Sequence, residues 1–280
     1  MKKIGFIDYY LAEWHADNYP AWIKAANESL SEDFCLCYAW GEIPSPEGVT
    51  NKEWCEKNGV TLCDSIEEVC EKSDFLFILA PSDPEKHLGY AEKVLAYKKP
   101  TYIDKTFAPD LKTAEKIFAL AEKYATPFFS TSALRYATEL DGIMDSEAAV
   151  VTGGGRSIEE YCIHQIEMLV KTLAAKPECV KVERQGEKQY VVSVKFEGGK
   201  KGSFVYSDAL PFTICAEKEG VSRYFSINSD FFGLLIKDIL KFFTNKKPPF
   251  DIKQTLYVMA VREKTVEGVN NPDKWLEIKF

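Results

Sequence analysis

The chain has 280 residues, 46% of them apolar and 28% charged, and its 43 acidic and 35 basic residues give a net charge of −8. This length suffices for one large domain or two unequal ones with their own cores. The acidic balance, with no block of lysine or arginine, excludes the usual nucleic-acid or anionic-membrane surface. No apolar run is long enough for a membrane span, and the one at residues 4–7 is too short for a signal peptide, so we expect a cytoplasmic protein.

The first half of the chain alternates between strand and helix patterns. Continuous apolar runs predict strands, and the segments between them carry apolar residues at spacings of three and four, as amphipathic helices do. The predicted strands lie at residues 4–7, 34–40, 74–80, 101–104 and 127–130. Asp110 is the expected cap of the helix that follows residue 110, and Asp64 or Ser65 that of a helix near residue 66. Five or six such units predict a doubly wound, Rossmann-like parallel sheet.

The second half has a different pattern. A helix is expected at 157–173, and alternating strands follow at 180–182, 190–196, 202–206 and 212–215. Residues 197–201 predict a hairpin turn, which makes the sheet mostly antiparallel. Two more helices are expected, at 231–243 and after Pro249. We therefore predict a Rossmann-like domain at residues 1–132 and an α+β domain at 133–280.

The loop after the first strand lacks the glycines of a dinucleotide-binding motif. A G-x-G-x-x-G loop needs them for its turn, for close approach of the diphosphate and for helix packing. Asp8, Tyr10 and Glu13 stand at these places. Pro20 can also be read as the first residue of the helix, which would lengthen the loop to residue 19. Ordinary dinucleotide binding at this loop is therefore in question.

Two other glycine clusters carry weaker signals. The segment Gly198–Ser203 looks like a phosphate-binding loop, but it lies between two strands, so a hairpin turn is the better interpretation. The segment Gly153–Arg156 precedes a helix. It is either a flexible entrance to an active site or a plain turn between domains.

The eight cysteines form neither a CxxC pair nor a cluster with zinc-ligand spacing. Because no secretory signal is evident, we predict reduced, mostly buried cysteines and no metal site.

Candidate proton-transfer residues are few, because the chain has three histidines, His15, His87 and His164. His164 lies on a predicted helix, four residues after Glu160 and three before Glu167, so both carboxylates share roughly one face with it. Such an arrangement can position a histidine as a proton carrier, although polar helix faces often look like this. Lys105 follows a predicted parallel strand at the edge where α/β sheets bind ligands.

Taken in order, these segments resemble the Gfo/Idh/MocA oxidoreductases, sugar and inositol dehydrogenases with an N-terminal Rossmann domain. The resemblance covers nearly the whole chain, and its order and spacing are more specific than any single motif. It rests on the segments Tyr102–Ala108, similar to a strand that ends in Glu-Lys-Pro; Ala80–His87, similar to a Thr-Pro-x-x-x-His loop; Ser132–Tyr136; and Gly154–Glu167. Departures include Cys162 for a glycine and Thr106 for a proline.

The resemblance implies hydride transfer between NAD or NADP and a sugar, polyol or related hydroxy compound. Lys105 and His164 would hold the reacting hydroxyl and exchange its proton, and Glu160 would orient them and the substrate. The implied cofactor-binding residues are Asp8, Tyr10, Leu11, Pro81, His87 and Lys105. The family also implies a homodimer or homotetramer that binds a small molecule. The alternatives are a non-catalytic ligand-binding or regulatory protein on the same scaffold, and a scaffold subunit that pairs through its antiparallel sheet.

Overall fold

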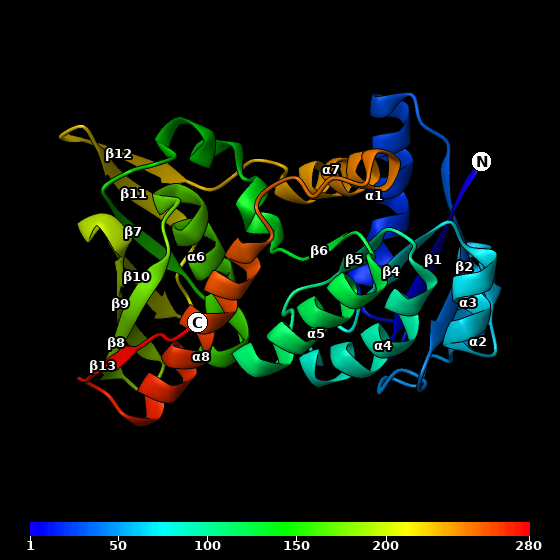
Figure 1. The fold of residues 1–280 in the computed structure, drawn as a ribbon, viewed down its shortest axis with the longest axis horizontal. Coiled ribbons are helices and arrows are strands. Elements are labelled where there is room, and N and C mark those ends of the chain that lie inside the picture. Colours follow the sequence, from blue (N-terminus) through cyan, green and yellow to red (C-terminus); the bar gives the residue numbers. More distant parts are fainter. The chain divides into compact units, whose positions relative to one another are not determined.

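The computed structural model describes all 280 residues, which divide into two compact units (Figure 1). The first unit comprises Met1–Thr131 and Phe232–Ile252, and the second comprises Ser132–Phe231 and Lys253–Phe280. Residues 232–252, which the sequence places in the second domain, thus belong to the first unit.

The first unit is a Rossmann-like α/β fold. Its six strands pair in parallel in the order β3-β2-β1-β4-β5-β6. The strands are β1 (Lys2–Asp8), β2 (Phe34–Gly41), β3 (Thr61–Leu62), β4 (Phe75–Ile78), β5 (Thr101–Ile103) and β6 (Phe128–Phe129). The helices are α1 (Trp14–Leu30), α2 (Asn51–Asn58), α3 (Ile66–Lys72), α4 (His87–Val94), α5 (Leu111–Tyr124) and α7 (Phe231–Asn245).

Strand β4 shows why this sheet is parallel and covered on both faces. Leu76, Phe77 and Ile78 are all fully buried, which requires helices above and below the strand. On one face, Phe77 contacts the rings of Tyr19 on α1 and Phe243 on α7. Helix α7 is therefore part of the first unit because it covers this face, although it follows the second unit's strands in the chain.

The second unit is an α+β fold with a seven-stranded mixed sheet in the order β12-β11-β7-β10-β9-β8-β13. Strands β7 and β10 pair in parallel, and the other neighbours are antiparallel. The strands are β7 (Ala148–Gly153), β8 (Pro177–Gly186), β9 (Gln189–Phe196), β10 (Lys201–Ser207), β11 (Thr213–Lys218), β12 (Val221–Ser226) and β13 (Trp275–Glu277). The predicted hairpin joins β9 and β10, and Gly198 and Gly199 adopt the positive φ values, 73° and 75°, that this turn needs.

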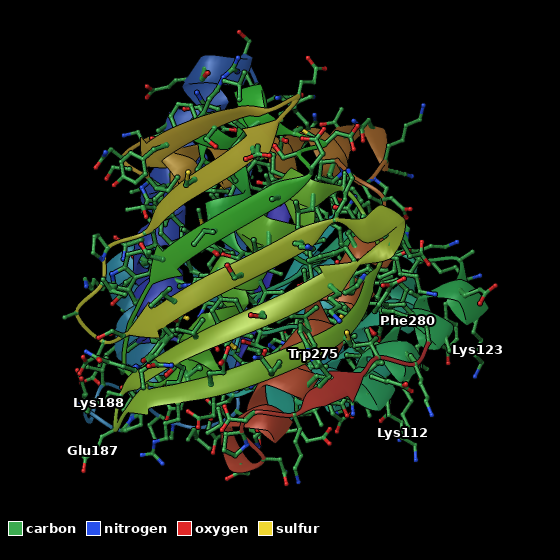
Figure 2. All side chains as sticks on the ribbon, turned by 90° about the vertical axis from the view of Figure 1, so that its left-hand side faces the viewer. Lys112, Lys123, Glu187, Lys188, Trp275 and Phe280 are labelled. Atoms are coloured by element: carbon green, nitrogen blue, oxygen red, sulfur yellow. The ribbon has the colours of Figure 1, made fainter.

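Helices α6 (Ile158–Leu173) and α8 (Lys253–Asn270) pack on one face of this sheet. Figure 2 shows the opposite face, on which no helix lies over the strands and Trp275 marks the edge strand β13. The predicted α+β class is thus confirmed. None of the helices is both long and apolar enough to cross a lipid bilayer.

Candidate functional site

The candidate site of the first unit lies at the carboxyl edge of its parallel sheet. Strand β1 ends at Asp8, and Asp104 and Lys105 come directly after β5. Strand β4 separates β1 from β5. Across the sheet, β3, β2 and β1 are followed by β4, β5 and β6, so the order of the strands reverses between β1 and β4. In open α/β sheets, ligands bind at such a point.

Asp8 is a buried carboxyl that organises the start of the loop. Its Oδ1 accepts hydrogen bonds from the backbone N–H of Tyr9 at 2.7 Å and of Ala80 at 2.9 Å. Its Oδ2 is buried without a hydrogen-bond partner. Burial, followed by the charge of Glu13, raises the pKa of Asp8 well above its ordinary value. Where a dinucleotide loop has its first glycine, this chain therefore has a carboxyl group that tends to keep its proton.

Glu13 caps helix α1, which begins at Trp14 and contains Pro20, so a helix start at Pro20 is wrong. The two carboxylate oxygens of Glu13 accept from the backbone N–H of His15 at 2.8 Å and of Ala16 at 2.5 Å. A helix N-terminus favours such an anion through its unpaired amides and its dipole. Burial raises the pKa of Glu13 above its ordinary value. The first turn of α1 therefore already holds an anion from its own chain.

The remaining loop residues are also bound internally. Leu11 is fully buried, and its backbone N–H donates to Asn51 Oδ1 at 3.1 Å. Tyr10 is half-buried, with its ring 5.8 Å from that of Tyr9. This loop is thus a packed connection rather than an open cradle.

These contacts test whether a nicotinamide dinucleotide fits here. Its diphosphate needs free amides at the start of the helix and a close approach of backbone. In this chain Glu13 occupies two of those amides, and the buried Asp8 adds a carboxyl group at the same edge. With Glu13 in this position the loop offers a diphosphate fewer free amides than a glycine loop does, which disfavours tight dinucleotide binding.

Lys105 and Pro81 are brought together at the sheet edge. The half-buried Lys105 Nζ donates to the carbonyl oxygen of Pro81 at 3.3 Å. His87 has a different position, because it is fully buried and its ring nitrogens contact the carbonyl oxygens of Leu79 and Phe107. These contacts favour a structural role for His87, linking two loop segments, over direct contact with a cofactor.

The sequence did not identify the partner of His15. His15 Nδ1 is hydrogen-bonded to Asp104 Oδ2 and lies 3.1 Å from the hydroxyl oxygen of Tyr19. The two residues of this His15–Asp104 pair are 89 positions apart in the chain. The available signal was weak: His15 is one of three histidines and follows the loop after the first strand.

In the second unit, helix α6 carries His164 and Glu160. The half-buried His164 contacts the hydroxyl of Ser132 through Nδ1 at 2.7 Å, and Glu160 pairs with Arg156. Glu167, which the sequence places on the face of His164, forms a buried ion pair with Arg135 Nε at 2.5 Å. His164 and Glu160 thus lie in the second unit and Lys105 in the first, so the structure assigns each its own surroundings.

The glycines before α6 pack tightly. A Cβ on Gly154 would lie 1.7 Å from the carbonyl oxygen of Ser207, and one on Gly155 would meet the ring of Tyr161. Glycine is required here for close packing of the turn from β7 into α6, and this favours the turn over a flexible entrance. All eight cysteines are free, and no cluster of three or more histidine, cysteine, aspartate or glutamate side chains could hold a metal ion.

Solved structures share this architecture from end to end. A myo-inositol dehydrogenase from Lactobacillus casei, in complex with NAD(H) and myo-inositol, aligns with a TM-score of 0.82 and 10% identity over 100% of this chain and 97% of that one. GenD2 of gentamicin A biosynthesis, in complex with NAD, aligns with a TM-score of 0.79 and 11% identity over 100% of this chain and 97% of that one. A probable dehydrogenase from Thermotoga maritima aligns with a TM-score of 0.79 and 13% identity over 98% of both chains.

These and many other structural neighbours are Gfo/Idh/MocA-type dehydrogenases, so the fold that the sequence resemblance implied is confirmed. At such identities the likeness shows a shared fold. No family model matches the chain. No curated protein matches it either.

Proposed function

We propose that the chain is a cytoplasmic oxidoreductase of this two-unit dehydrogenase fold, acting on a sugar, polyol or related hydroxy compound with NAD or NADP as redox partner. The observation that supports it is the end-to-end structural likeness to dehydrogenases, one of them in complex with NAD(H) and myo-inositol. The self-capped α1 leads us to expect weaker cofactor binding than a glycine loop gives.

The proposed roles of the chain's own residues follow from their chemistry. Lys105 is a half-buried ammonium group at the carboxyl edge of the sheet, suited to hold a hydroxyl oxygen. His164, with its Nδ1 at Ser132, is the candidate proton carrier of the second unit. Glu160, at the start of α6, would bind a substrate hydroxyl. The nicotinamide, when bound, would supply the hydride acceptor.

Titration with NADH and NADPH tests this proposal. We expect weak binding to the wild type, and roughly tenfold tighter binding to Glu13→Gln, because this change removes the negative charge that competes with the diphosphate. Isothermal calorimetry and nicotinamide fluorescence measure the affinity of each cofactor for the wild type and for Glu13→Gln. Glu53→Gln, which alters a capping glutamate on α2, is the matched control and should bind as the wild type does.

Absence of binding by the wild type and Glu13→Gln at millimolar cofactor would reject the oxidoreductase proposal. The second candidate is a non-catalytic ligand-binding or regulatory protein. It is favoured by the same Glu13 cap, because a helix N-terminus held by its own carboxylate needs no phosphate. On this view, Lys105→Ala and His164→Ala leave the biological role intact.

We also propose that the protein is a homodimer or homotetramer formed through the uncovered face of the second unit's sheet (Figure 2). The strand register places Tyr224 opposite Cys215, and Cys215 opposite Val150, so these side chains share one face. Tyr224 and Val150 are exposed, and burial of such apolar surface drives association. Light scattering should give at least twice the monomer mass, and Val150→Lys should reduce it; a monomeric wild type would reject the proposal.

A further inference from the structure

The imidazole of His15 is held on one side. Its hydrogen bonds run through Nδ1, which pairs with Asp104 Oδ2 and lies near the hydroxyl of Tyr19. The side chain is almost buried, with 6% of the residue exposed. Both partners lie in the same unit as His15, on α1 and directly after β5. The ring therefore has one fixed nitrogen, Nδ1, and Nε2 makes no hydrogen bond within the protein.

Asp104 is arranged to remain ionised. Burial raises the pKa of this carboxyl, but the His15 ring, through its hydrogen bond and through its charge when protonated, and the charge and backbone N–H of Lys105 together lower the pKa below its ordinary value. The hydroxyl of Tyr102 donates to Oδ1 at 3.3 Å, and the backbone N–H of Lys105 donates to it at 2.8 Å. An ionised carboxylate at Nδ1 fixes the tautomer in which Nδ1 carries the proton and Nε2 has a lone pair.

Tyr19 supports the same assignment. Burial and the charges of Asp104 and Glu13 raise the pKa of Tyr19 well above its ordinary value, so the phenol keeps its proton. Its hydroxyl donates to Asp104 Oδ2 at 3.5 Å. Both hydrogen-bond donors near Oδ2, the His15 ring and the Tyr19 hydroxyl, thus complement a carboxylate.

Two further groups at this edge indicate the class of ligand. The buried Oδ2 of Asp8 has no hydrogen-bond partner, and burial and the charge of Glu13 raise the pKa of this carboxyl well above its ordinary value. The indole of Trp14 is 53% exposed and its centroid lies 5.3 Å from that of the His15 ring. An exposed aromatic face beside a few polar groups suits a ring with apolar C–H faces and hydroxyl edges. The neighbouring carboxylates of Glu13 and Asp104 disfavour an anion.

We propose that His15 is a proton-transfer residue, with Asp104 as its positioning residue, in a site for an uncharged hydroxylated ligand such as a sugar ring or cyclic polyol. The proton of a ligand hydroxyl passes to Nε2 of His15, and the resulting imidazolium is stabilised by the Asp104 carboxylate. This transfer leaves an alkoxide on the ligand, and the proton returns to the same oxygen when the step reverses. This role goes beyond the proposed oxidoreductase function and stands whether or not a nicotinamide dinucleotide binds.

Nuclear magnetic resonance of ¹⁵N-histidine-labelled protein tests the tautomer, and the three histidines make assignment direct. We expect His15 to carry its proton on Nδ1 with Nε2 unprotonated. We expect diethyl pyrocarbonate to modify His15 faster than the fully buried His87, as measured by mass spectrometry. Asp104→Asn should slow the reaction at His15 roughly tenfold or more, because the tautomer is no longer fixed.

Tyr19→Phe is the matched control, since it removes one hydroxyl from the cluster and leaves the His15–Asp104 pair; it should change the rate less than about twofold. A proton on Nε2 in the folded wild type, or a His15 no more reactive than His87, would overturn the proton-transfer role. These two measurements are made on the wild type, so they test the role even where Asp104→Asn fails to fold. Myo-inositol and glucose are the probes for the ligand: protection of His15 by either supports the ligand class, and protection by neither overturns it. Neither readout requires a cofactor, so failure here is distinct from a failed NADH titration.

Discussion

Replacement of Phe243 with alanine is expected to lower the free energy of unfolding of the first unit by about 3–5 kcal/mol, the usual cost of emptying a buried aromatic position. Phe243 is 1% exposed. Its ring stacks on Phe75 with centroids 4.9 Å apart and meets the edge of Phe77 at 5.3 Å. Because these partners lie on β4, the substitution tests whether α7 belongs to this core.

Urea denaturation followed by circular dichroism measures the effect. Phe243→Leu keeps most of the volume and should cost less than about 1.5 kcal/mol. Val49→Ala, at a loop position of the same unit that is 40% exposed, should stay within about 0.5 kcal/mol of the wild type. A Phe243→Ala variant as stable as Val49→Ala would show that residues 232–252 are not part of the first unit's core.

The order of strands and helices could be predicted because their signals are local. The apolar run at residues 74–80 contains β4, which is buried on both faces as such runs usually are. Asp110 caps α5 as predicted, with Oδ1 accepting from the backbone N–H of Thr113 at 2.7 Å. Each of these features depends on a few adjacent residues.

The start of α1 could not be predicted by the same rules. Glutamate is not among the usual N-cap residues, whereas proline is common in the first turn of a helix, so Pro20 was a reasonable candidate. In the structure, the longer side chain of Glu13 reaches the amides of His15 and Ala16, and Pro20 lies inside the helix. The loop is consequently shorter and more tightly bound than a start at Pro20 implies.

Contacts between segments that are distant in the chain cannot be predicted from local sequence patterns. Helix α7 has an ordinary apolar face, and nothing in that face says which sheet it covers. Asp104 and Lys105 could be placed at a strand end, but the pairing of Asp104 with His15 depends on β1 and β5 flanking β4. Likewise Glu167 has the spacing of a site residue, and its partner becomes visible only with the fold.

The partner of Glu167 is Arg135, and their buried ion pair in the second unit is the place where we expect the second large effect on stability. Their side chains are 6% and 3% exposed, and Arg135 Nη2 also donates to Gln254 Oε1 at 2.7 Å. Arg135→Met should lower the free energy of unfolding of this unit by about 3–5 kcal/mol, because the Glu167 carboxylate stays buried without its main counter-charge. Urea denaturation measures this cost.

The double variant Arg135→Met with Glu167→Leu distinguishes a charge effect from loss of packing. Removing both charges leaves no ionised group to desolvate, and apolar side chains of similar length fill much of the same space. We therefore expect the double variant to be more stable than Arg135→Met alone, with a coupling energy of about 1–3 kcal/mol in the cycle. Equal stability of the two would contradict the assignment, and Glu167 would then be better explained as a packing residue of α6 than as the counter-charge that fixes Arg135.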